Sequence, residues 1–163
     1  MKTDFTIRQA QQSDAVELKE LFQNTVLVIN RRDYSQAEVE DWASCGNNLS
    51  NIKERIETHC FVVAVNQQSQ IVGFSSITSQ GYLHSMFVHK DFQGEGIATM
   101  LLEEIERYAI TAGITRITSE VSLTARPFFE KKGYVVEKEQ KRKANQLSLT
   151  NFLMAKGGVF GVL

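Results

Sequence analysis

The chain has 163 residues, of which 42% are hydrophobic and 23% are charged, and its formal net charge is −1. This length and composition suit one domain over residues 1–163 with a substantial apolar core. A near-neutral charge gives no general attraction to nucleic acid or anionic membranes, and the sequence holds no run of about 18 apolar residues that would predict a bilayer-spanning helix.

Cysteine and histidine are sparse in the sequence. Cys45 and Cys60 have no metal-ligand spacing and are predicted to be free thiols, and the histidines are His59, His84 and His89. No metal site is therefore expected. The first four residues lack the apolar stretch of a signal peptide, and together with the free thiols this predicts a cytoplasmic location.

The N-terminal third predicts one strand followed by three helices. Residues 5–8 alternate as a strand does, and the next segment spaces its apolar residues for one face of a helix. Asp14, with Glu17 three positions later, suits an N-terminal capping box, and Ser35 suits a cap for the second helix. The predicted helices cover residues 15 to about 30, 36–43 and 52–57.

The sequence after these helices predicts an antiparallel meander, then a crossover helix, and finally two closing strands. Three apolar segments in succession suggest antiparallel strands, and the long helix after them has one apolar face and ends at Gly113. The next strand completes a β-α-β crossover, and the whole order indicates an α+β sandwich. The strands are 61–65, 71–77, 82–88, 115–121, 134–139 and 147–154, and the helices are 97–112 and 124–132.

A strand, a short turn and a helix start rich in small residues occupy residues 87–99. The first turn of a helix leaves N–H groups unpaired and partly positive, so it binds phosphate when side chains do not block the approach. Gly94 and Gly96 remove side chains there, and Ala98 keeps the next turn narrow. The alternative is a flexible loop before a buried helix. Thr99 at the third glycine position and the missing Walker lysine argue against a dinucleotide fold or a P-loop.

This segment resembles the GNAT acetyltransferase superfamily, whose signature Gln/Arg-x-x-Gly-x-Gly/Ala is matched by Gln93, Gly96 and Ala98. Residues 125–134, Ala-Arg-Pro-Phe-Phe-Glu-Lys-Lys-Gly-Tyr, are similar to a later motif of the same family. The resemblance implies the α/β/α sandwich of the acyl-CoA N-acyltransferase fold. That fold is an α+β arrangement with a mixed, mostly antiparallel sheet whose middle strands splay apart.

The resemblance also implies acetyl-CoA as a co-substrate. Backbone amides of the helix start would hold its pyrophosphate, the backbone of Met86 and Val88 would pair with the pantetheine arm, and Ser122 would line the slot for the thioester. Arg126 is either a contact for the nucleotide or a solvated helix charge. The implied cofactor-binding residues are Met86, Phe87, Val88, Gln93, Gly94, Glu95, Gly96, Ile97, Ala98, Thr99, Ser122, Arg126 and Phe129.

His84 is the candidate general base that deprotonates the acceptor amine. Strand alternation places Tyr82, His84 and Met86 on one face, and an imidazole ordinarily titrates near neutral pH. Residues 83–89 look like the strand of arylalkylamine acetyltransferases, in which a histidine at this position helps to deprotonate the amine. The alternative is a histidine paired in the core, or one that lines the pocket without chemistry.

Phe129 departs from the family pattern, since many members have a tyrosine there that protonates the leaving sulfur. A phenylalanine side chain cannot donate a proton. Tyr82 or Tyr134 would then replace it, or the thiolate leaves unassisted or through water, or turnover is slow. Tyr82 is therefore the second candidate catalytic residue, whereas Tyr134 is expected to pack beside a helix.

The resemblance thus implies an N-acetyltransferase that acts on a primary amine by direct attack, with a small-molecule acceptor favoured. Trp42 and residues 151–154 look like a bacterial subgroup of small-substrate acetyltransferases. One alternative is an acyl-CoA-binding sensor with little catalysis, which Phe129 motivates. The other is an acetyltransferase for protein lysines or N-termini.

The acceptor pocket is expected between the early helices and the open strand edge. Arg31 and Arg32 would attract a carboxylate there and Tyr34 and Trp42 would line the wall, although a solvated loop and core packing are the preferred explanations for these four residues. Residues 157–163 are apolar and glycine-rich, and are either frayed or a contact for a second subunit in a homodimer. Neither a nucleic acid nor a membrane is expected as a partner.

Overall fold

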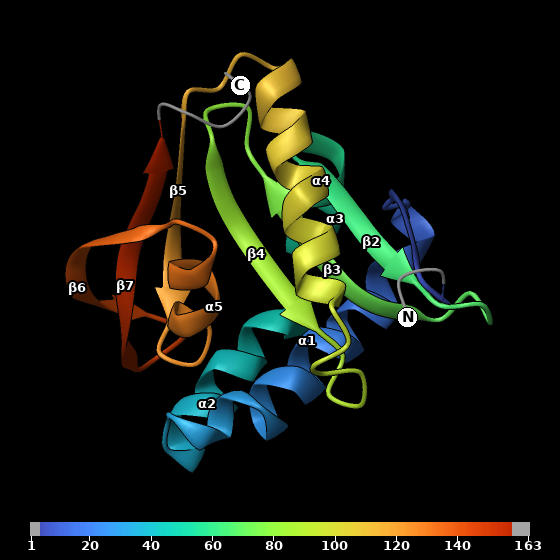
Figure 1. The fold of residues 1–163 in the computed structure, drawn as a ribbon. Coiled ribbons are helices and arrows are strands. Elements are labelled where there is room, and N and C mark those ends of the chain that lie inside the picture. The colour runs from blue at the N-terminus through green and yellow to red at the C-terminus, as the bar shows by residue number, and fades with distance from the viewer. Residues whose placement is uncertain (1–3, 158–163) are drawn as a thin grey trace.

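The computed structural model describes residues 4–157 as one seven-stranded sheet with helices on both faces (Figure 1). The strands lie in the order β1-β2-β3-β4-β5-β7-β6, and each neighbouring pair is antiparallel except β4 and β5. Residues 158–163, most of the tail considered for a subunit contact, lie outside the described residues. The strands are β1 (Thr6–Gln9), β2 (Cys60–Val65), β3 (Ile71–Ile77), β4 (Tyr82–Val88), β5 (Arg116–Ser122), β6 (Val135–Lys143) and β7 (Ser148–Gly157).

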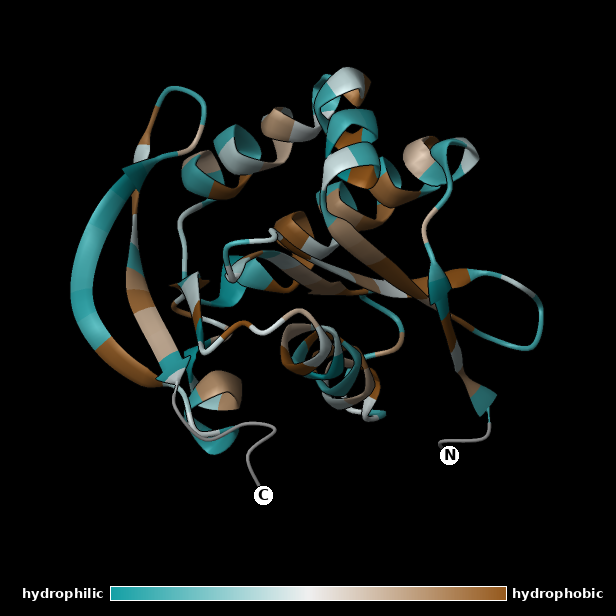
Figure 2. Ribbon diagram, turned by 90° about the horizontal axis from the view of Figure 1, so that it is seen from above, coloured by the Kyte–Doolittle hydropathy of each residue, from teal (hydrophilic) through white to brown (hydrophobic). Residues whose placement is uncertain are grey.

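The helices form two layers, one on each face of the sheet. Figure 2 looks nearly along α4, which lies on one side of the sheet, while the N-terminal helices gather on the other side. This arrangement confirms the predicted α+β sandwich. None of the helices within residues 4–157 is both long and apolar enough to cross a bilayer. The helices are α1 (Ala15–Val28), α2 (Gln36–Ser44), α3 (Leu49–Thr58), α4 (Ile97–Thr111) and α5 (Arg126–Lys131).

The largest core cluster lies between the sheet and α4. Leu101, Ile105 and Ala109 of α4 are completely buried and repeat at helical spacing on one face. Each leucine-sized side chain buried in this way contributes about 1.5–3 kcal/mol to folding. The helix ends where Gly113 adopts a φ of +75°, a left-handed conformation that favours glycine. This packing fixes the position of the N-terminal end of α4 against the sheet.

The two middle strands part soon after they meet. β4 and β5 are in register only at Tyr82–Thr118 and Leu83–Ser119, whereas β3 and β4 stay paired as far as Gly73–Val88. The Ser119 hydroxyl donates to the Leu83 carbonyl at 2.7 Å and closes the ladder there. Beyond that point the edge of β4 faces a gap, which confirms the predicted splaying of the middle strands.

A β-bulge interrupts β4 at His84. Ser76 of β3 lies opposite Ser85 and Ile77 lies opposite Leu83, so His84 has no partner in the register. The extra residue reverses the alternation beyond it. Met86 consequently packs against the core cluster that includes α4, while the His84 ring contacts the Tyr82 ring. The prediction that Met86 shares one face with these two residues was wrong, because simple alternation does not allow for a bulge.

The predicted capping box at the start of α1 does not form. Asp14 accepts two hydrogen bonds from the Arg8 guanidinium, at 2.9 and 3.0 Å, and makes no side-chain cap for α1. Glu17 instead accepts from the backbone N–H of Ile71 at 2.8 Å and ties α1 to β3. The box predicted behind Ser35 is present, since Ser35 and Glu38 bond reciprocally.

Candidate active site

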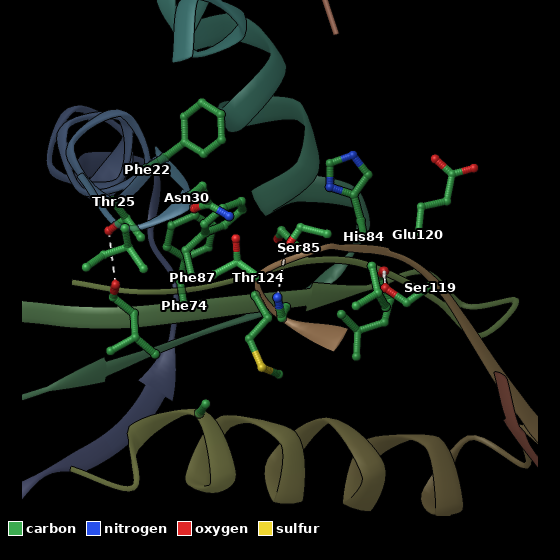
Figure 3. A pocket seen from close by; sticks show the side chains of 18 of the residues that line it. Phe22, Thr25, Asn30, Phe74, His84, Ser85, Phe87, Ser119, Glu120 and Thr124 are labelled. Atoms are coloured by element: carbon green, nitrogen blue, oxygen red, sulfur yellow. Dashed lines mark hydrogen bonds between the residues drawn. The ribbon is translucent and has the colours of Figure 1, made fainter. Parts of the chain in front are cut away.

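A cavity of about 790 Å³ opens where β4 and β5 separate. It extends from the first turn of α4 across the gap to the side of the sheet covered by α1, α2 and α3. Figure 3 shows Phe22, Thr25, His84 and Thr124 around this space. All the residues predicted to bind the cofactor line the cavity except Glu95 and Arg126.

The loop before α4 leaves an open cradle of backbone amides. Gly94 and Gly96 have φ values of +75° and +83°, and a Cβ atom added at either would have no atom within 4 Å. Gly96 is the N-cap of α4, so the N–H groups of the first turn have no partner inside the helix. Ala98 and Thr99 lie in that turn and line the cavity. The open space and the partial positive charge suit a pyrophosphate group.

The carbonyl of Val88 anchors the end of β4. It accepts a hydrogen bond from Thr25 Oγ1 of α1 at 3.0 Å (Figure 3) and another from Gln93 Nε2 at 2.7 Å. Gln93 also lies 3.4 Å from the carbonyl oxygen of His89. The signature glutamine therefore holds the cradle loop against the strand through its side-chain amide. Sequence spacing predicted Gln93 as a site residue but did not predict Thr25.

The backbone of Met86 lies on the open edge of β4. The N–H of His89 donates to the Val72 carbonyl, so His89 and Phe87 direct their backbone groups toward β3. In an antiparallel pair the alternate residues direct theirs outward, which places the N–H and carbonyl of Met86 toward the gap. A ligand chain entering the gap therefore meets hydrogen-bonding groups like those of a neighbouring strand.

Thr124 adds an unsatisfied polar atom to the far wall of the gap. Its Oγ1 is buried and has no hydrogen-bond partner within the described residues, and the residue lines the cavity (Figure 3). Ser122, which was predicted to line the slot, does line it, but its hydroxyl accepts from the Ala125 N–H at 3.0 Å. Both hydroxyls keep a proton to donate, but Thr124 Oγ1 is the buried one without any partner, so a bond to a ligand there relieves the larger penalty.

His84 faces the cavity among basic neighbours. Its ring packs edge to face against His59, with centroids 5.7 Å apart, and against Tyr82 at 6.0 Å. The side chain is open to the cavity, yet the surrounding protein removes enough water to lower the pKa of His84 to about 4, with the charges of Arg55 and His59 adding to this effect. The expectation of titration near neutral pH was therefore wrong for the free protein, and His84 is neutral at pH 7.

Tyr82 lies beside His84 with its hydroxyl committed to no hydrogen bond within residues 4–157. Burial, with a contribution from Glu120, raises the pKa of Tyr82 to about 12. The phenol therefore keeps its proton at physiological pH and is able to donate it.

Phe129 and Tyr134 occupy the core on the α5 side. Phe129 is only 3% exposed, and its ring packs edge to face against Tyr134 at 5.2 Å. The Tyr134 hydroxyl donates to Glu106 at 2.8 Å, and Lys156 pairs with the same carboxylate at 3.2 Å. Burial and Glu106 raise the pKa of Tyr134, which does not line the cavity. Of the two tyrosines considered as replacements for a missing acid, Tyr82 alone lines the cavity.

An aromatic wall closes the side of the cavity near α1 and α2. Phe22, Trp42 and Phe87 contact one another edge to face, with ring centroids 5.1–6.5 Å apart. Tyr34 joins them through Trp42, and its hydroxyl donates to the Thr150 carbonyl and accepts from the Leu123 N–H. These residues line the cavity, whereas Arg31 and Arg32 do not.

The two remaining predicted cofactor residues, Glu95 and Arg126, do not line the cavity. Glu95 is exposed and lies outside the lining. The Arg126 guanidinium lies 4.4 Å from the Phe152 ring centroid and bonds to Glu130 at 3.2 Å. Within residues 4–157 no three His, Cys, Asp or Glu side chains come together as they would around a metal ion.

Residues 30–156 match the family model described as an acetyltransferase (GNAT) domain. The chain belongs to the GNAT acetyltransferase family. The match covers most of the chain, including the cradle, the splayed strands and the residues around His84. The sequence motifs at Gln93–Ala98 and 125–134 therefore identified the family correctly.

Other GNAT proteins share both the sequence and the architecture. The chain is 29% identical to the uncharacterized N-acetyltransferase YafP of Escherichia coli over 149 residues, which cover 91% of this chain and 93% of that protein. A GCN5-related N-acetyltransferase from Rhodopseudomonas palustris superposes with a TM-score of 0.89 at 27% identity, covering 93% and 94% of the two chains. The PaiA N-acetyltransferase of Thermoplasma acidophilum, solved with coenzyme A, shares the fold with a TM-score of 0.77 at 19% identity, covering 94% and 99%.

Arg55 and His59 are further residues of this GNAT site that were not predicted from the sequence. Arg55, on α3, lines the cavity, and His59, which ends α3, packs against His84. Arg55 comes from a helix that was predicted only as a scaffold, and His59 lies just beyond the end of that helix. No local motif signals their role, because only the tertiary fold brings α3 against the bulge of β4.

Proposed function

We propose that this chain transfers an acetyl group from acetyl-CoA to the nitrogen of a primary amine by direct attack. The observation that carries the proposal is that one cavity joins the glycine cradle, the open edge of β4 and the His84–Tyr82 pair. Membership of the GNAT family and the coenzyme A bound to the structurally similar PaiA protein support it.

Acetyl-CoA fits the empty features of the cavity. The cradle formed by Gly94, Gly96 and the first turn of α4 would hold the pyrophosphate, and the outward backbone of Met86 would pair with the pantetheine arm. The unsatisfied Thr124 hydroxyl lies on the other wall and supplies a donor to the same ligand. These contacts orient the thioester beside His84, and holding two reactants in place supplies much of the rate.

His84 would act as the proton acceptor for the attacking amine. With a pKa of about 4 it is neutral at physiological pH and has a free acceptor nitrogen, although it is a weak base until its surroundings change. The nitrogen forms a bond to the thioester carbon, the C–S bond breaks, and the amine proton passes to His84. Tyr82, which keeps its proton, would donate to the leaving thiolate in place of the tyrosine that Phe129 replaces.

The shape of the cavity favours a small acceptor over a protein side chain. Aromatic rings from α1, α2 and β4 wall the acceptor side, and a concave aromatic lining of this kind is typical of small-molecule sites. A cytoplasmic location is part of the proposal, since Cys45 and Cys60 are both free thiols.

Thermal unfolding in the presence of acetyl-CoA, CoA or NAD is the first test. A ligand at about 100 times its dissociation constant stabilises the folded protein by about 2.7 kcal/mol. Stabilisation by acetyl-CoA and CoA but not by NAD is expected, and no response to either CoA form would refute the proposal.

A panel of acceptors then distinguishes the possible reactions. We expect CoA release with small primary amines. Transfer to lysine-containing peptides alone would assign the protein to the protein-modifying class, and CoA binding without turnover on any amine would make it a sensor.

A further inference from the structure

Arg55 is a cation that lines the cavity without a partner. Its residue is half-buried on α3, and its guanidinium has no hydrogen bond or ion pair among residues 4–157. Burial lowers the pKa of Arg55, with only a partly opposing effect from the charge of Glu54. A guanidinium offers five donors in a rigid fork, and such a group is rarely left half-buried without an acceptor.

The cavity lining as a whole carries more positive than negative side chains. Arg55, Arg142 and Lys143 line it, and Glu120 is its one acidic residue among those described. Glu120 is already paired with Arg142 at 2.9 Å. Arg142 and Lys143 are exposed, so Arg55 is the cation of this set that is held away from water. An anionic ligand group would therefore be stabilised most strongly at Arg55.

Arg55 is also close to the reacting end of the cavity. Arg55, Tyr82 and His84 line the same cavity, and one turn beyond Arg55 the His59 ring packs on His84 at 5.7 Å. The guanidinium charge is felt at both imidazoles, since it lowers the pKa of each. An anionic group bound to Arg55 is thus within the reach of one small molecule whose amine lies at His84.

We propose that the acceptor amine also carries a carboxylate, and that Arg55 binds this carboxylate while His84 faces the amine. The inference rests on the proposed acetyl transfer and names its substrate class as amino acids in the broad sense. A guanidinium fork matches a carboxylate in a bidentate contact, and one such fork without a second buried cation suits a single negative charge better than a phosphate dianion.

The same anion would help the chemistry. Arg55 and His59 both disfavour a proton on His84. A carboxylate beside Arg55 offsets its charge and thereby favours the imidazolium that forms when the amine loses its proton. Tyr82, the other titratable group in contact with His84, stays neutral in this range. A correct acceptor would therefore strengthen the base that deprotonates it.

The test compares matched acceptors that differ in one group. An ω-amino acid, its carboxamide and its phosphonate analogue are supplied with acetyl-CoA to the wild-type protein, Arg55→Gln, Arg55→Lys and Lys53→Gln. The wild type should prefer the carboxylate over the carboxamide by about 10- to 100-fold in kcat/KM, the value of one charge-assisted contact. Arg55→Gln should bring this ratio close to one, Arg55→Lys should restore part of it, and Lys53→Gln, which removes an exposed cation of the same helix outside the cavity lining, should keep it.

The ratio separates the two proposals. Arg55→Gln also makes His84 a stronger base, but within the variant this change acts on both acceptors and cancels in their ratio, so it does not mimic the result. Equal transfer to both acceptors by the wild type, a ratio unchanged in Arg55→Gln, or a preference for the phosphonate would overturn the carboxylate assignment while leaving acetyl transfer intact. If no amine is acetylated, the preference for the carboxylate is measured instead as equilibrium binding of the two acceptors to the CoA-saturated protein. A carboxylate preference that is lost in Arg55→Gln still supports the assignment. The absence of any carboxylate preference in the wild type overturns it.

Discussion

The imidazole rings of His59 and His84 pack edge to face with their centroids 5.7 Å apart and their planes inclined at 65°. His59 ends α3, and His84 is the bulged residue of β4, so this contact joins the helical layer to the splayed strand. His59 Nδ1 is buried and has no hydrogen-bond partner within the described residues. Because the Arg55 charge also acts on both imidazoles, this region is sensitive to added protons.

The stability of the protein should fall as the pH drops below about 6.5. The pKa of His84 is lowered to about 4 and that of His59 is also lowered, so in this range the unfolded chain binds more protons than the folded one. The contribution is fully present above the unfolded pKa and is lost as the pH falls toward the folded pKa. Urea unfolding of the wild type and His84→Gln between pH 7.5 and 4.5 tests this. The variant should lose less stability, and parallel curves would contradict the assignment.

Replacing Arg55 should raise the pKa of His84. The Arg55 charge is the second cause of the lowering after burial, so Arg55→Gln removes repulsion while leaving the burial in place. An NMR titration of the His84 ring protons measures the shift directly and without turnover. Lys53→Gln, which removes an exposed cation of the same helix outside the cavity lining, is the matched control and should leave the value where it is. An unchanged titration in Arg55→Gln would mean that the guanidinium is too far from the His84 ring to affect its pKa.

Loss of the His84 imidazole should slow acetyl transfer without weakening CoA binding. A positioned general base typically contributes about 10²- to 10⁴-fold, and His84→Ala should lower kcat within that range at neutral pH. Calorimetry with CoA reports on the cradle, which lies at the other end of β4 and should be unaffected. A variant with wild-type kcat would remove His84 from the mechanism.

A side chain at Gly96 should block the cradle. Gly96→Glu projects a carboxylate into the space where no atom lies within 4 Å of an added Cβ, and the charge repels phosphate. We expect CoA affinity to fall by more than about tenfold.

Gly113→Glu is the matched control for this change. Gly113 has a similar φ of +75° and similarly open space at the opposite end of α4, so it carries the same conformational strain of about 1–2 kcal/mol. The control should retain its CoA affinity. Equal loss in both variants would mean that strain alone explains the result.

Loss of the hydroxyl should lower the rate at Tyr82 and the stability at Tyr134. Tyr82→Phe removes the donor that lines the cavity and should lower kcat by about tenfold or more. Tyr134→Phe removes a buried hydrogen bond to Glu106 and should cost about 1–3 kcal/mol of stability with little change in kcat. Turnover and urea denaturation are measured for both. A normal rate in Tyr82→Phe would show that the thiolate leaves without this acid.

The cradle was predictable from the sequence because its chemistry is local. Gly94, Gly96 and the first turn of α4 are consecutive, and their role depends on backbone conformation that glycine spacing indicates directly. The helices and strands were predicted to within a few residues for the same reason, since apolar periodicity reports the buried face.

The acceptor side was not predictable in this way. The direction of Met86 depends on a bulge, which adds one residue to β4 without any proline or glycine to mark it. Arg55 shares a cavity with His84, and His59 contacts it, only because the fold brings the end of α3 to β4, and their sequence positions look like an ordinary helix end. Arg31 and Arg32, which were considered as anion contacts from the sequence, lie outside the cavity, and Arg55 lines it instead.

The short register between β4 and β5 gives the cofactor a second role under the proposed function. The two halves of the sheet share backbone pairing only at Tyr82–Thr118 and Leu83–Ser119. A pantetheine arm in the gap would hydrogen-bond to the open edge of β4, as a further strand would do. Each tenfold rise in free acetyl-CoA above its dissociation constant would then add about 1.4 kcal/mol to the folding free energy. The lifetime of this protein against unfolding and proteolysis would thus follow the acetyl-CoA supply, independently of whether an acceptor is present.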